Sequence, residues 1–345
     1  MLTCGCGKQV EEFPAISSHD IAAAMLELAN SPTVLMFHAE MLPPISDSVG
    51  DDVQVSDPPL APTGPLTAYK TFLDSRPPVF ETCAIDEVIS LAHLAPKLPL
   101  HIVHLSAVEA IPALRRARDQ GVRITAETCF HYLSLKAEDV GDGDTRHKCC
   151  PPIRGHSNQD GLWEELVKAE EKDGVIKTVV SDHSPCTPSL KLLPTTAGGR
   201  HDDGADALKE RGDFFAAWGG ISSVGLGLSI LWTERAQGRR KFEIEDVVRW
   251  CCVNTAKQVG LEKQKGMLKE GFDADVVVFD DEAEWEVQPS TMLFRNKCSP
   301  YQGKRLKGVV KETWLRGQRV YSREEGFDEG RGPVGRLLLE PRSSV

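Results

Sequence analysis

Three apolar runs in this sequence each stop at a residue that could bind a metal ion or move a proton. His38 follows TVLMF, His104 follows HIV, and Asp182 follows KTVVS. Imidazole and carboxylate groups are the ligand types found at catalytic zinc sites that keep an open coordination position. If these three side chains meet, they could bind a metal ion, and Asp182 could take a proton from metal-bound water.

The elements that must bring these residues together are predicted to alternate between strand and helix. The predicted strands are 33–37, 99–105, 122–127 and 175–181. The predicted helices are 19–29, 84–95, 107–118 and 243–260. Alternation of this kind predicts an α/β fold with parallel strands under helices. The active sites of such sheets lie at the carboxyl ends of the strands, where His38, His104 and Asp182 stand.

The pattern changes from about residue 266 onward. Segments 273–280 and 309–321 are predicted strands with turn-forming glycines between them, which indicates a small β portion. The stretch 194–211 is rich in Gly, Asp and Thr and is predicted to be a flexible surface insertion. The proline-rich stretch 57–65 is predicted to be a loop.

Composition narrows the class of protein. The 345 residues carry a net charge of -11 and are 41% hydrophobic, which is typical of a globular protein and argues against a nucleic-acid partner. No apolar run approaches the roughly 20 residues that span a bilayer, and the first residues do not have the pattern of a signal peptide. The ten cysteines are scattered and predict reduced thiols in a cytoplasmic protein.

Other polar clusters are candidates for substrate contacts. Glu127 and His131 follow the third predicted strand, and KCCPPIR presents Lys148 and Arg154 on a turn. GGISSVG, at 219–225, is a glycine-flanked loop whose backbone groups are available to bond a ligand. Taken by itself, each of these clusters is better interpreted as an ordinary loop. His183, beside Asp182, has two interpretations: it orients Asp182, or it is solvated.

Several stretches together resemble the allantoinases, a branch of the cyclic amidohydrolase family that also contains dihydroorotases and hydantoinases. The matching stretches are EEFPAIS, FHAE, IVHLSAVEAI, ETCFHYL, KCCPPIR, VVSDHSPCTPSLK, WGGISSVG, GFDADVVVFD and NKCSPYQGK. They occur in the family's order over nearly the whole chain. SDHSPCTP followed by WGGISS favours allantoinase over its relatives.

The resemblance implies a TIM-like (β/α)8 barrel with a small β-sandwich and a site for two zinc ions bridged by hydroxide. His38 resembles the fifth-strand ligand, His104 the sixth-strand ligand, and Asp182 the eighth-strand ligand and general base. The reaction implied is hydrolysis of the cyclic amide of allantoin to allantoate. Gly220, Ile221 and Ser222 resemble the family's substrate-binding loop. By analogy, the stretch containing Lys148 and Arg154 lies near the site.

The chain departs from the family pattern at its beginning. It contains no HxH motif, and Lys8 is out of register with the lysine that the family carboxylates. We therefore expect an N-terminally truncated relative: an incomplete barrel at 1–265 followed by a β-sandwich portion at 266–345. With three matched ligands, the chain is expected to hold at most one zinc ion.

Three interpretations follow from this departure. The chain is an allantoinase acting on a small molecule, a hydantoinase-like or dihydroorotase-like enzyme, or a non-catalytic remnant. Assembly as a homo-oligomer is compatible with each.

Overall fold

The computed structural model describes residues 16–43, 60–168, 174–194, 211–328, 330 and 332–338. Residues 195–210 of the predicted insertion at 194–211 and residues 57–59 of the predicted loop at 57–65 lie outside these residues. Residues 60–65 contain no helix or strand, as the predicted loop requires. The chain divides into two compact units. The first consists of Met1–Val224 and Met292–Tyr301, and the second of Gly225–Thr291 and Gln302–Val345.

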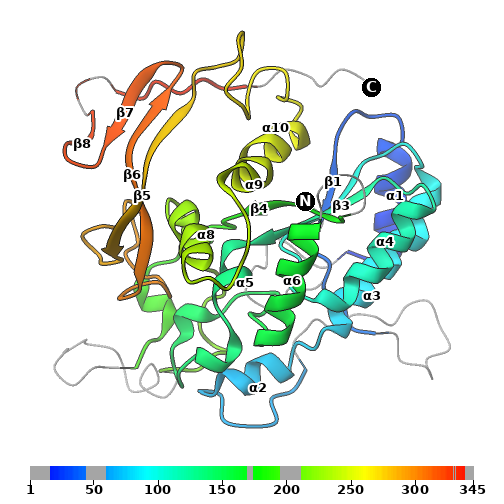
Figure 1. Cartoon of the computed structure of the whole chain (residues 1–345). Coiled ribbons are helices and arrows are strands. Elements are labelled where there is room, and N and C mark those ends of the chain that lie inside the picture. Colours follow the sequence, from blue (N-terminus) through cyan, green and yellow to red (C-terminus); the bar gives the residue numbers. More distant parts are fainter. Residues whose placement is uncertain are drawn as a thin grey trace. The chain divides into compact units, whose positions relative to one another are not determined.

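A parallel four-stranded sheet is the centre of the first unit (Figure 1). Its strands are β1 (Leu35–Phe37), β2 (Leu100–Ile102), β3 (Ile124–Cys129) and β4 (Ile176–Val180), in the order β1-β2-β3-β4. In the register of the first pair, Phe37 lies opposite Ile102. Strand residues are largely buried on both faces, as the continuous apolar runs predict. The α/β class predicted from the sequence is therefore confirmed, as are all four strands of the parallel sheet.

The helices of the first unit follow the strands along the chain. They are α1 (Ser18–Leu28), α2 (Tyr69–Asp74), α3 (Val79–Leu91), α4 (Ile111–Asp119), α5 (Phe130–Ser134) and α6 (His156–Lys168). Helix α1 begins where the Ser17 side chain accepts a bond from the Asp20 N–H and the Asp20 carboxylate accepts one from the Ser17 N–H. This capping box satisfies donors that the first helical turn leaves unpaired. Helix α3 packs beside both α1 and α4 (Figure 1).

Helix α6 is held to the unit by a large buried side chain. Trp163 is 1% exposed, and its indole N–H donates to the Leu133 carbonyl oxygen at 2.8 Å. Helix α6 is not predicted from the sequence pattern, because its apolar positions are interrupted by Asn158, Gln159 and Gly161.

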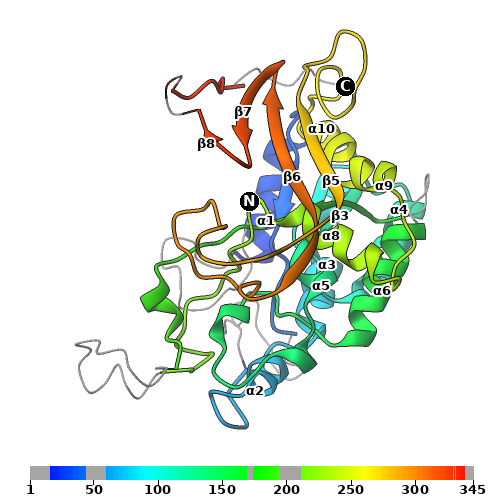
Figure 2. The same cartoon turned by 60° about the vertical axis from the view of Figure 1, so that its left-hand side comes forward.

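The second unit contains an antiparallel sheet (Figure 2). Its strands are β5 (Val276–Glu286), β6 (Arg305–Leu315), β7 (Gln318–Ser322) and β8 (Gly326–Phe327), and they pair in that order. The predicted β portion is thus present. Among the described strands β5 has one neighbour, β6, and Val277 and Val278 of β5 are exposed.

Three helical segments accompany this sheet within the second unit. They are α8 (Gly227–Ala236), α9 (Ile244–Val248) and α10 (Asn254–Gln258). The helix predicted over 243–260 is interrupted by a π-helical turn at Arg249–Val253, which separates α9 from α10. Wider turns of this kind break the regular hydrogen-bond ladder that periodicity alone predicts.

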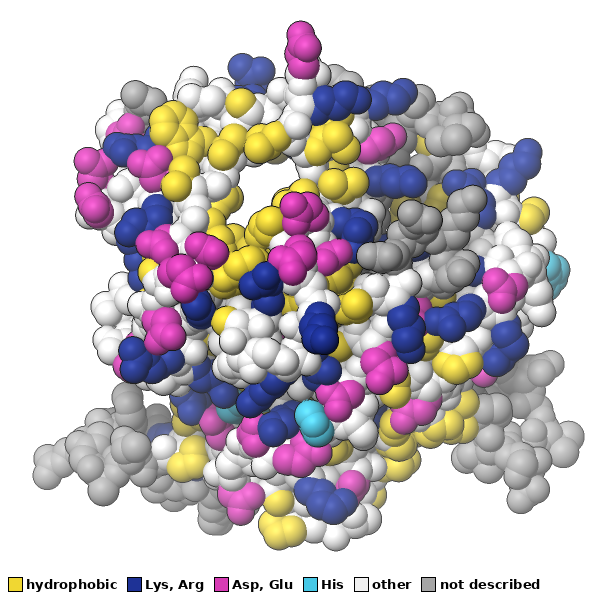
Figure 3. Space-filling view, viewed as in Figure 1, with side chains coloured by type: hydrophobic (Ala, Val, Ile, Leu, Met, Phe, Trp, Pro, Cys, Tyr) yellow, Lys and Arg dark blue, Asp and Glu magenta, His cyan; other side chains and the backbone are white. Residues whose placement is uncertain are grey.

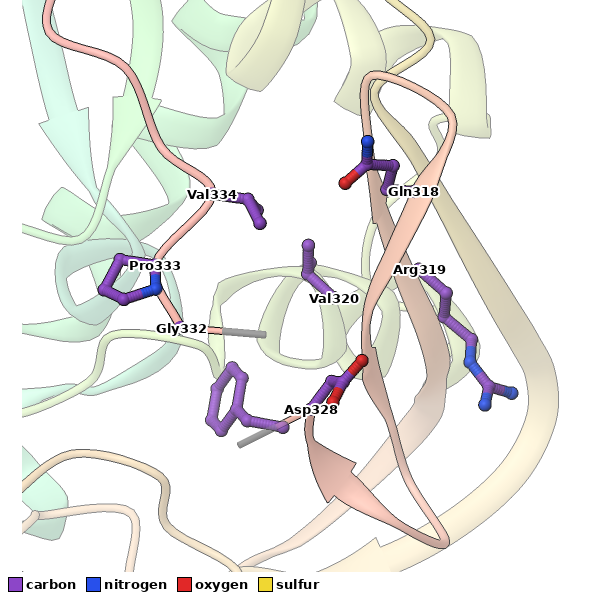
Figure 4. Close-up of a pocket in the computed structure, with 8 residues that line it drawn as sticks. Gln318, Arg319, Val320, Asp328, Gly332, Pro333 and Val334 are labelled. Atoms are coloured by element: carbon purple, nitrogen blue, oxygen red, sulfur yellow. The ribbon is translucent and has the colours of Figure 1, made fainter. Parts of the chain in front are cut away.

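Two hollows lie within the second unit. The larger has a volume of about 870 Å³ and is lined mostly by apolar side chains of α8 to α10 and β5; Figure 3 shows hydrophobic side chains around it. The smaller, of about 290 Å³, lies between β7 and the segment Gly332–Val334 (Figure 4). Within the described part of the chain, no helix is both long and apolar enough to cross a membrane.

The anchoring of α6 by Trp163 gives a prediction about stability. Trp163→Ala should lower the free energy of unfolding by about 3–5 kcal/mol, because it leaves a cavity and an unpaired Leu133 carbonyl. Urea unfolding followed by circular dichroism measures this loss. Val167→Ala on the exposed side of the same helix should change stability by about 0.5 kcal/mol or less. Equal losses in the two variants would contradict the assignment.

Candidate functional site

The candidate site is built from residues that directly follow the strands of the parallel sheet. His38 follows β1, while His104 and Asp182 each stand two residues beyond the ends of β2 and β4. Ala39, His104 and Asp182 all have left-handed backbones, with φ of 56°, 41° and 42°. Residues other than glycine are rarely held in this conformation, and they concentrate at functional sites. The backbone therefore turns sharply at each of the three strand ends.

His38 and His104 contact each other directly. His38 Nδ1 lies 2.9 Å from His104 Nε2, and the two ring centroids are 4.6 Å apart. Both side chains are buried. The predicted convergence of these two imidazoles is present in the structure.

A buried ion pair supports His38 from its other side. His38 Nε2 is 2.8 Å from Glu40 Oε2, and Arg76 Nη1 donates to the same carboxylate oxygen at 3.0 Å. Burial by itself would raise the pKa of Glu40, but Arg76 and His38 outweigh it and hold that pKa at about 2. Glu40 is therefore a buried carboxylate, stabilised by a guanidinium and an imidazole.

Asp182 acts on the same group of histidines through its charge. Burial and the neighbouring His38 lower the pKa of His104 to about 4, against the opposing charges of Asp182 and Glu40. His131, on α5, is fully buried, and neither ring nitrogen has a hydrogen-bond partner. Burial also lowers the pKa of His131 to about 4, and Asp182 again opposes the shift. Both imidazoles are therefore neutral near pH 7.

The histidine pair fits one metal ion, but the full family ligand set is not assembled. Two imidazole nitrogens bound to one tetrahedral zinc ion are about 3.3 Å apart, close to the separation of the His38 and His104 nitrogens. Within the described residues, His104 Nδ1 has no hydrogen-bond partner. Among the residues that the structure describes, no three or more His, Cys, Asp or Glu side chains form a group ready to hold a metal ion.

His183 anchors the predicted substrate loop. Its Nδ1 accepts bonds from the backbone N–H groups of Ser223 and Val224 at 3.0 and 3.1 Å. Backbone bridging between His183 and Ile221 joins the same two segments. Of the two interpretations left open by the sequence, neither describes this role: the ring holds the loop.

Two buried lysines hold backbone carbonyl groups of that loop and of the segment just before it. Lys191 Nζ donates to the carbonyls of Trp218 and Gly220 at 3.0 and 2.6 Å, and Lys148 Nζ donates to those of Phe215 and Ala217. Burial lowers the pKa of Lys148 to about 8. Backbone carbonyls thus take the place of water around these ammonium groups.

The other predicted substrate residues are tied into the same region. The Ile221 carbonyl accepts a bond from Ser184 N–H at 3.0 Å, and the Ser222 carbonyl accepts one from Ser299 Oγ at 2.6 Å. Arg154 is buried and donates to Glu81 at 2.7 Å, so its charge is paired inside the protein.

The roles of Arg76, Glu81 and Lys191 are not visible in the sequence, because each contacts a group that lies far along the chain from it. Lys191 is the last residue of the stretch VVSDHSPCTPSLK, but its bonds reach residues 218 and 220. Glu40 was visible in FHAE, but its link to Arg76 was not. His131 was noted as a polar residue past the third strand, and its complete burial required the structure.

Comparison with known proteins finds sequence relatives and structural neighbours of this chain. The model of the amidohydrolase family matches residues 219–321. The chain is 43% identical to the allantoinase of Saccharomyces cerevisiae, covering 96% of this chain and 64% of that protein. It is 40% identical to the allantoinase of Streptomyces avermitilis, covering 95% of this chain and 64% of that protein. The chain thus spans less than two thirds of the length of these relatives.

Solved structures of hydantoinases share the fold. The L-hydantoinase of Arthrobacter aurescens aligns with a TM-score of 0.73 at 22% identity, covering 94% of this chain and 65% of that structure. A D-hydantoinase aligns with a TM-score of 0.69 at 27% identity, covering 92% of this chain and 63% of that structure.

The loop held by His183 gives a prediction. Gly220 has φ of 146°, and a Cβ there would lie 2.3 Å from the Ser184 carbonyl oxygen. Gly220→Ala should therefore lower the free energy of unfolding by about 2–5 kcal/mol. In Gly225→Ala, where φ is 82° and nothing lies within 4 Å of the added carbon, the loss should be about 1–2 kcal/mol. Urea titration measures both, and equal losses would refute the close contact.

The neutral buried histidines predict a pH dependence. The pKa of His131 is about 4 in the folded chain, whereas an unfolded histidine titrates near about 6.5. Between these values the unfolded chain binds more protons, so stability should fall as pH drops from about 6.5 toward 4. In His131→Leu the fall should be shallower by about 1.4 kcal/mol per pH unit, measured by urea unfolding at several pH values. His93→Leu, which removes an exposed histidine, should retain the wild-type dependence.

Proposed function

We propose that the chain is a member of the amidohydrolase family and acts as an allantoinase, hydrolysing the cyclic amide of allantoin to allantoate. The observation that carries this proposal is the direct contact of His38 with His104 at adjacent strand ends. It occurs in a chain that is 40–43% identical to allantoinases over 95–96% of its length. We also propose that the β1–β4 sheet belongs to an incomplete (β/α)8 barrel at 1–265, followed by a β-sandwich portion at 266–345; the likeness to hydantoinases supports this.

The proposed metal ligands are Nδ1 of His38, Nε2 of His104 and the carboxylate of Asp182. They would hold one zinc ion. When bound, the ion would polarise the amide carbonyl and lower the pKa of a water molecule. The charge of Asp182 raises the pKa values of His104 and His131 against the effect of burial. This interaction supports its assignment to this group of residues.

Asp182 is proposed as the general base. Its carboxylate would take the proton from the attacking water and give it to the leaving ring nitrogen. The left-handed backbone at Asp182 fixes where this side chain leaves the end of β4. A backbone that already places the general base reduces the motion needed to bring this base and the substrate together.

The loop of Gly220, Ile221 and Ser222 is proposed to bind the ring amide through its backbone. Each carbonyl oxygen has two lone pairs, so those already bonded to Lys191, Ser184 and Ser299 can accept a second donor from the substrate. Those bonds also hold the loop in place.

Lys148 and Arg154 are proposed to act next to the substrate. Lys148 has one ammonium proton beyond its two bonds to the carbonyls of Phe215 and Ala217. Arg154, paired with Glu81, would shape the wall of the site.

A second candidate is ring opening of 5-substituted hydantoins. The likeness to a D-hydantoinase at 27% identity favours it. The motif SDHSPCTP with WGGISS favours allantoin.

The test is turnover with defined substrates. The full chain, supplied with zinc chloride, should bind one zinc ion and convert allantoin to allantoate, measured by chromatography of the product. Asp182→Asn should lower the rate by about 10²–10⁴-fold, because it removes the base and weakens the metal site. His93→Ala, an exposed substitution outside the site, should match wild type.

Other outcomes select the alternatives. Opening of 5-substituted hydantoins or dihydroorotate without any action on allantoin would select the second candidate. No turnover of any of these cyclic amides by a folded, zinc-supplied chain would identify a non-catalytic relative.

A further inference from the structure

We propose that Glu40, held by Arg76, is a positioning residue that fixes the proton of His38 on Nε2. His38 then presents the lone pair of Nδ1 toward His104. The metal-binding part of this inference rests on the proposed function, whereas the proton position is a property of the chain by itself.

The three side chains form one buried unit. Glu40 is 0% exposed and Arg76 is 4% exposed. A single carboxylate oxygen, Glu40 Oε2, lies 2.8 Å from His38 Nε2 and 3.0 Å from Arg76 Nη1. The ring position of His38 is therefore coupled to a buried ion pair and not to solvent.

The chemistry of the partners decides which atoms donate. Arginine remains charged and only donates hydrogen bonds. A guanidinium at 3.0 Å favours the ionised form of Glu40, and an ionised carboxylate only accepts. His38 Nε2 must then be the donor in the bond to Glu40.

The other nitrogen of the ring follows from this assignment. In a neutral imidazole one nitrogen carries the proton and the other carries the lone pair. With the proton on Nε2, the lone pair of His38 Nδ1 faces His104 Nε2 at 2.9 Å. Carboxylates that bond the outer nitrogen of a metal-binding histidine fix its tautomer and raise its basicity as a ligand.

The local chain path makes this contact specific to Glu40. His38 and Glu40 flank Ala39, whose left-handed backbone has φ of 56°. After Glu40, the Met41 N–H donates to the Phe80 carbonyl at 3.1 Å, which pins the following segment. The carboxylate is thus held between two fixed points of the backbone.

A second buried ion pair of the same unit bonds backbone groups and not an imidazole. Arg154 bonds Glu81, and the Glu81 carboxylate also accepts from the N–H groups of Ser106 and Ala107. Because these two partners are backbone groups, the Arg154–Glu81 pair stabilises the backbone at Ser106 and Ala107. The Glu40 pair reaches an imidazole instead.

The experiment measures histidine tautomers in the metal-free full chain. Long-range proton–nitrogen NMR of chain labelled with ¹⁵N-histidine should show His38 as the Nε2–H form, with its signal assigned by its loss in His38→Gln. In the double variant Glu40→Leu with Arg76→Met, which removes both charges together, the share of Nδ1–H form should rise about tenfold or more. Zinc chloride affinity, measured by chelator competition, should fall about 10–100-fold.

A matched control removes a different ion pair of the same unit. Glu165 is buried and pairs with the half-exposed Arg115, away from the histidines. Glu165→Leu with Arg115→Met should leave the His38 tautomer as in wild type. A tautomer change of the same size in this control would overturn the proposal, because a general loss of packing would explain it.

Glu40→Gln is a second test variant, because it removes the charge but keeps a hydrogen-bond acceptor for His38 and Arg76. Its amide oxygen can still accept from His38 and Arg76, so the Nε2–H form should persist while zinc affinity falls several-fold, since the charge is lost. If neither the His38 nitrogen signals nor zinc affinity change in Glu40→Gln, or if the folded double variant keeps the wild-type tautomer, the proposal is wrong. Failure of wild type to bind zinc or open allantoin would instead refute the proposed function and leave the tautomer result standing.

Discussion

The parallel pairing of β1 with β2 is the constraint on which the candidate site depends. Because Phe37 lies opposite Ile102, the next residues of both strands emerge at the same edge of the sheet. A turn in the backbone at Ala39 and another at His104 then direct the two imidazoles at each other. A slip of one residue in this register would send one of the side chains to the opposite face, so the hydrophobic pattern of the two short strands also sets the chemistry.

The second requirement is that buried charge be satisfied without water. Glu40 and Glu81 each meet a guanidinium, while Lys148 and Lys191 meet backbone carbonyls. Unpaired, any of these groups would cost several kcal/mol of stability. These charged groups lie around His38 and the loop at 219–225. Moving any of them would break bonds that replace water around a buried charge, so solvation as well as packing holds this region in place. A rigid surrounding is what a site needs if its reacting groups are to be held ready before the substrate arrives.

Much of this arrangement could be predicted from the sequence. The four buried strands and the residues that follow them were visible as apolar runs with polar ends, and the contact of His38 with His104 follows once the strands are parallel. The partners contributed by other parts of the chain were not visible. Arg76 and Lys191 act through distances set by tertiary packing, which leaves no periodic trace in the sequence. Helix α6 was missed because polar residues dilute its pattern, and the predicted helix at 243–260 is broken by a π-helical turn that periodicity does not encode. The predicted set of three metal ligands stays a prediction. His38 and His104 contact each other, whereas Asp182 interacts with His104 through its charge.

The exposed valines of β5 have a consequence for handling the protein in solution. Among the described strands β5 is bonded on one side only, and Val277 and Val278 leave apolar surface beside its unpaired backbone groups. An edge of this kind can recruit the same edge of a neighbouring molecule. Self-association should therefore increase with concentration, and a charged residue in place of Val277 is the simplest means of improving solubility while leaving the first unit untouched.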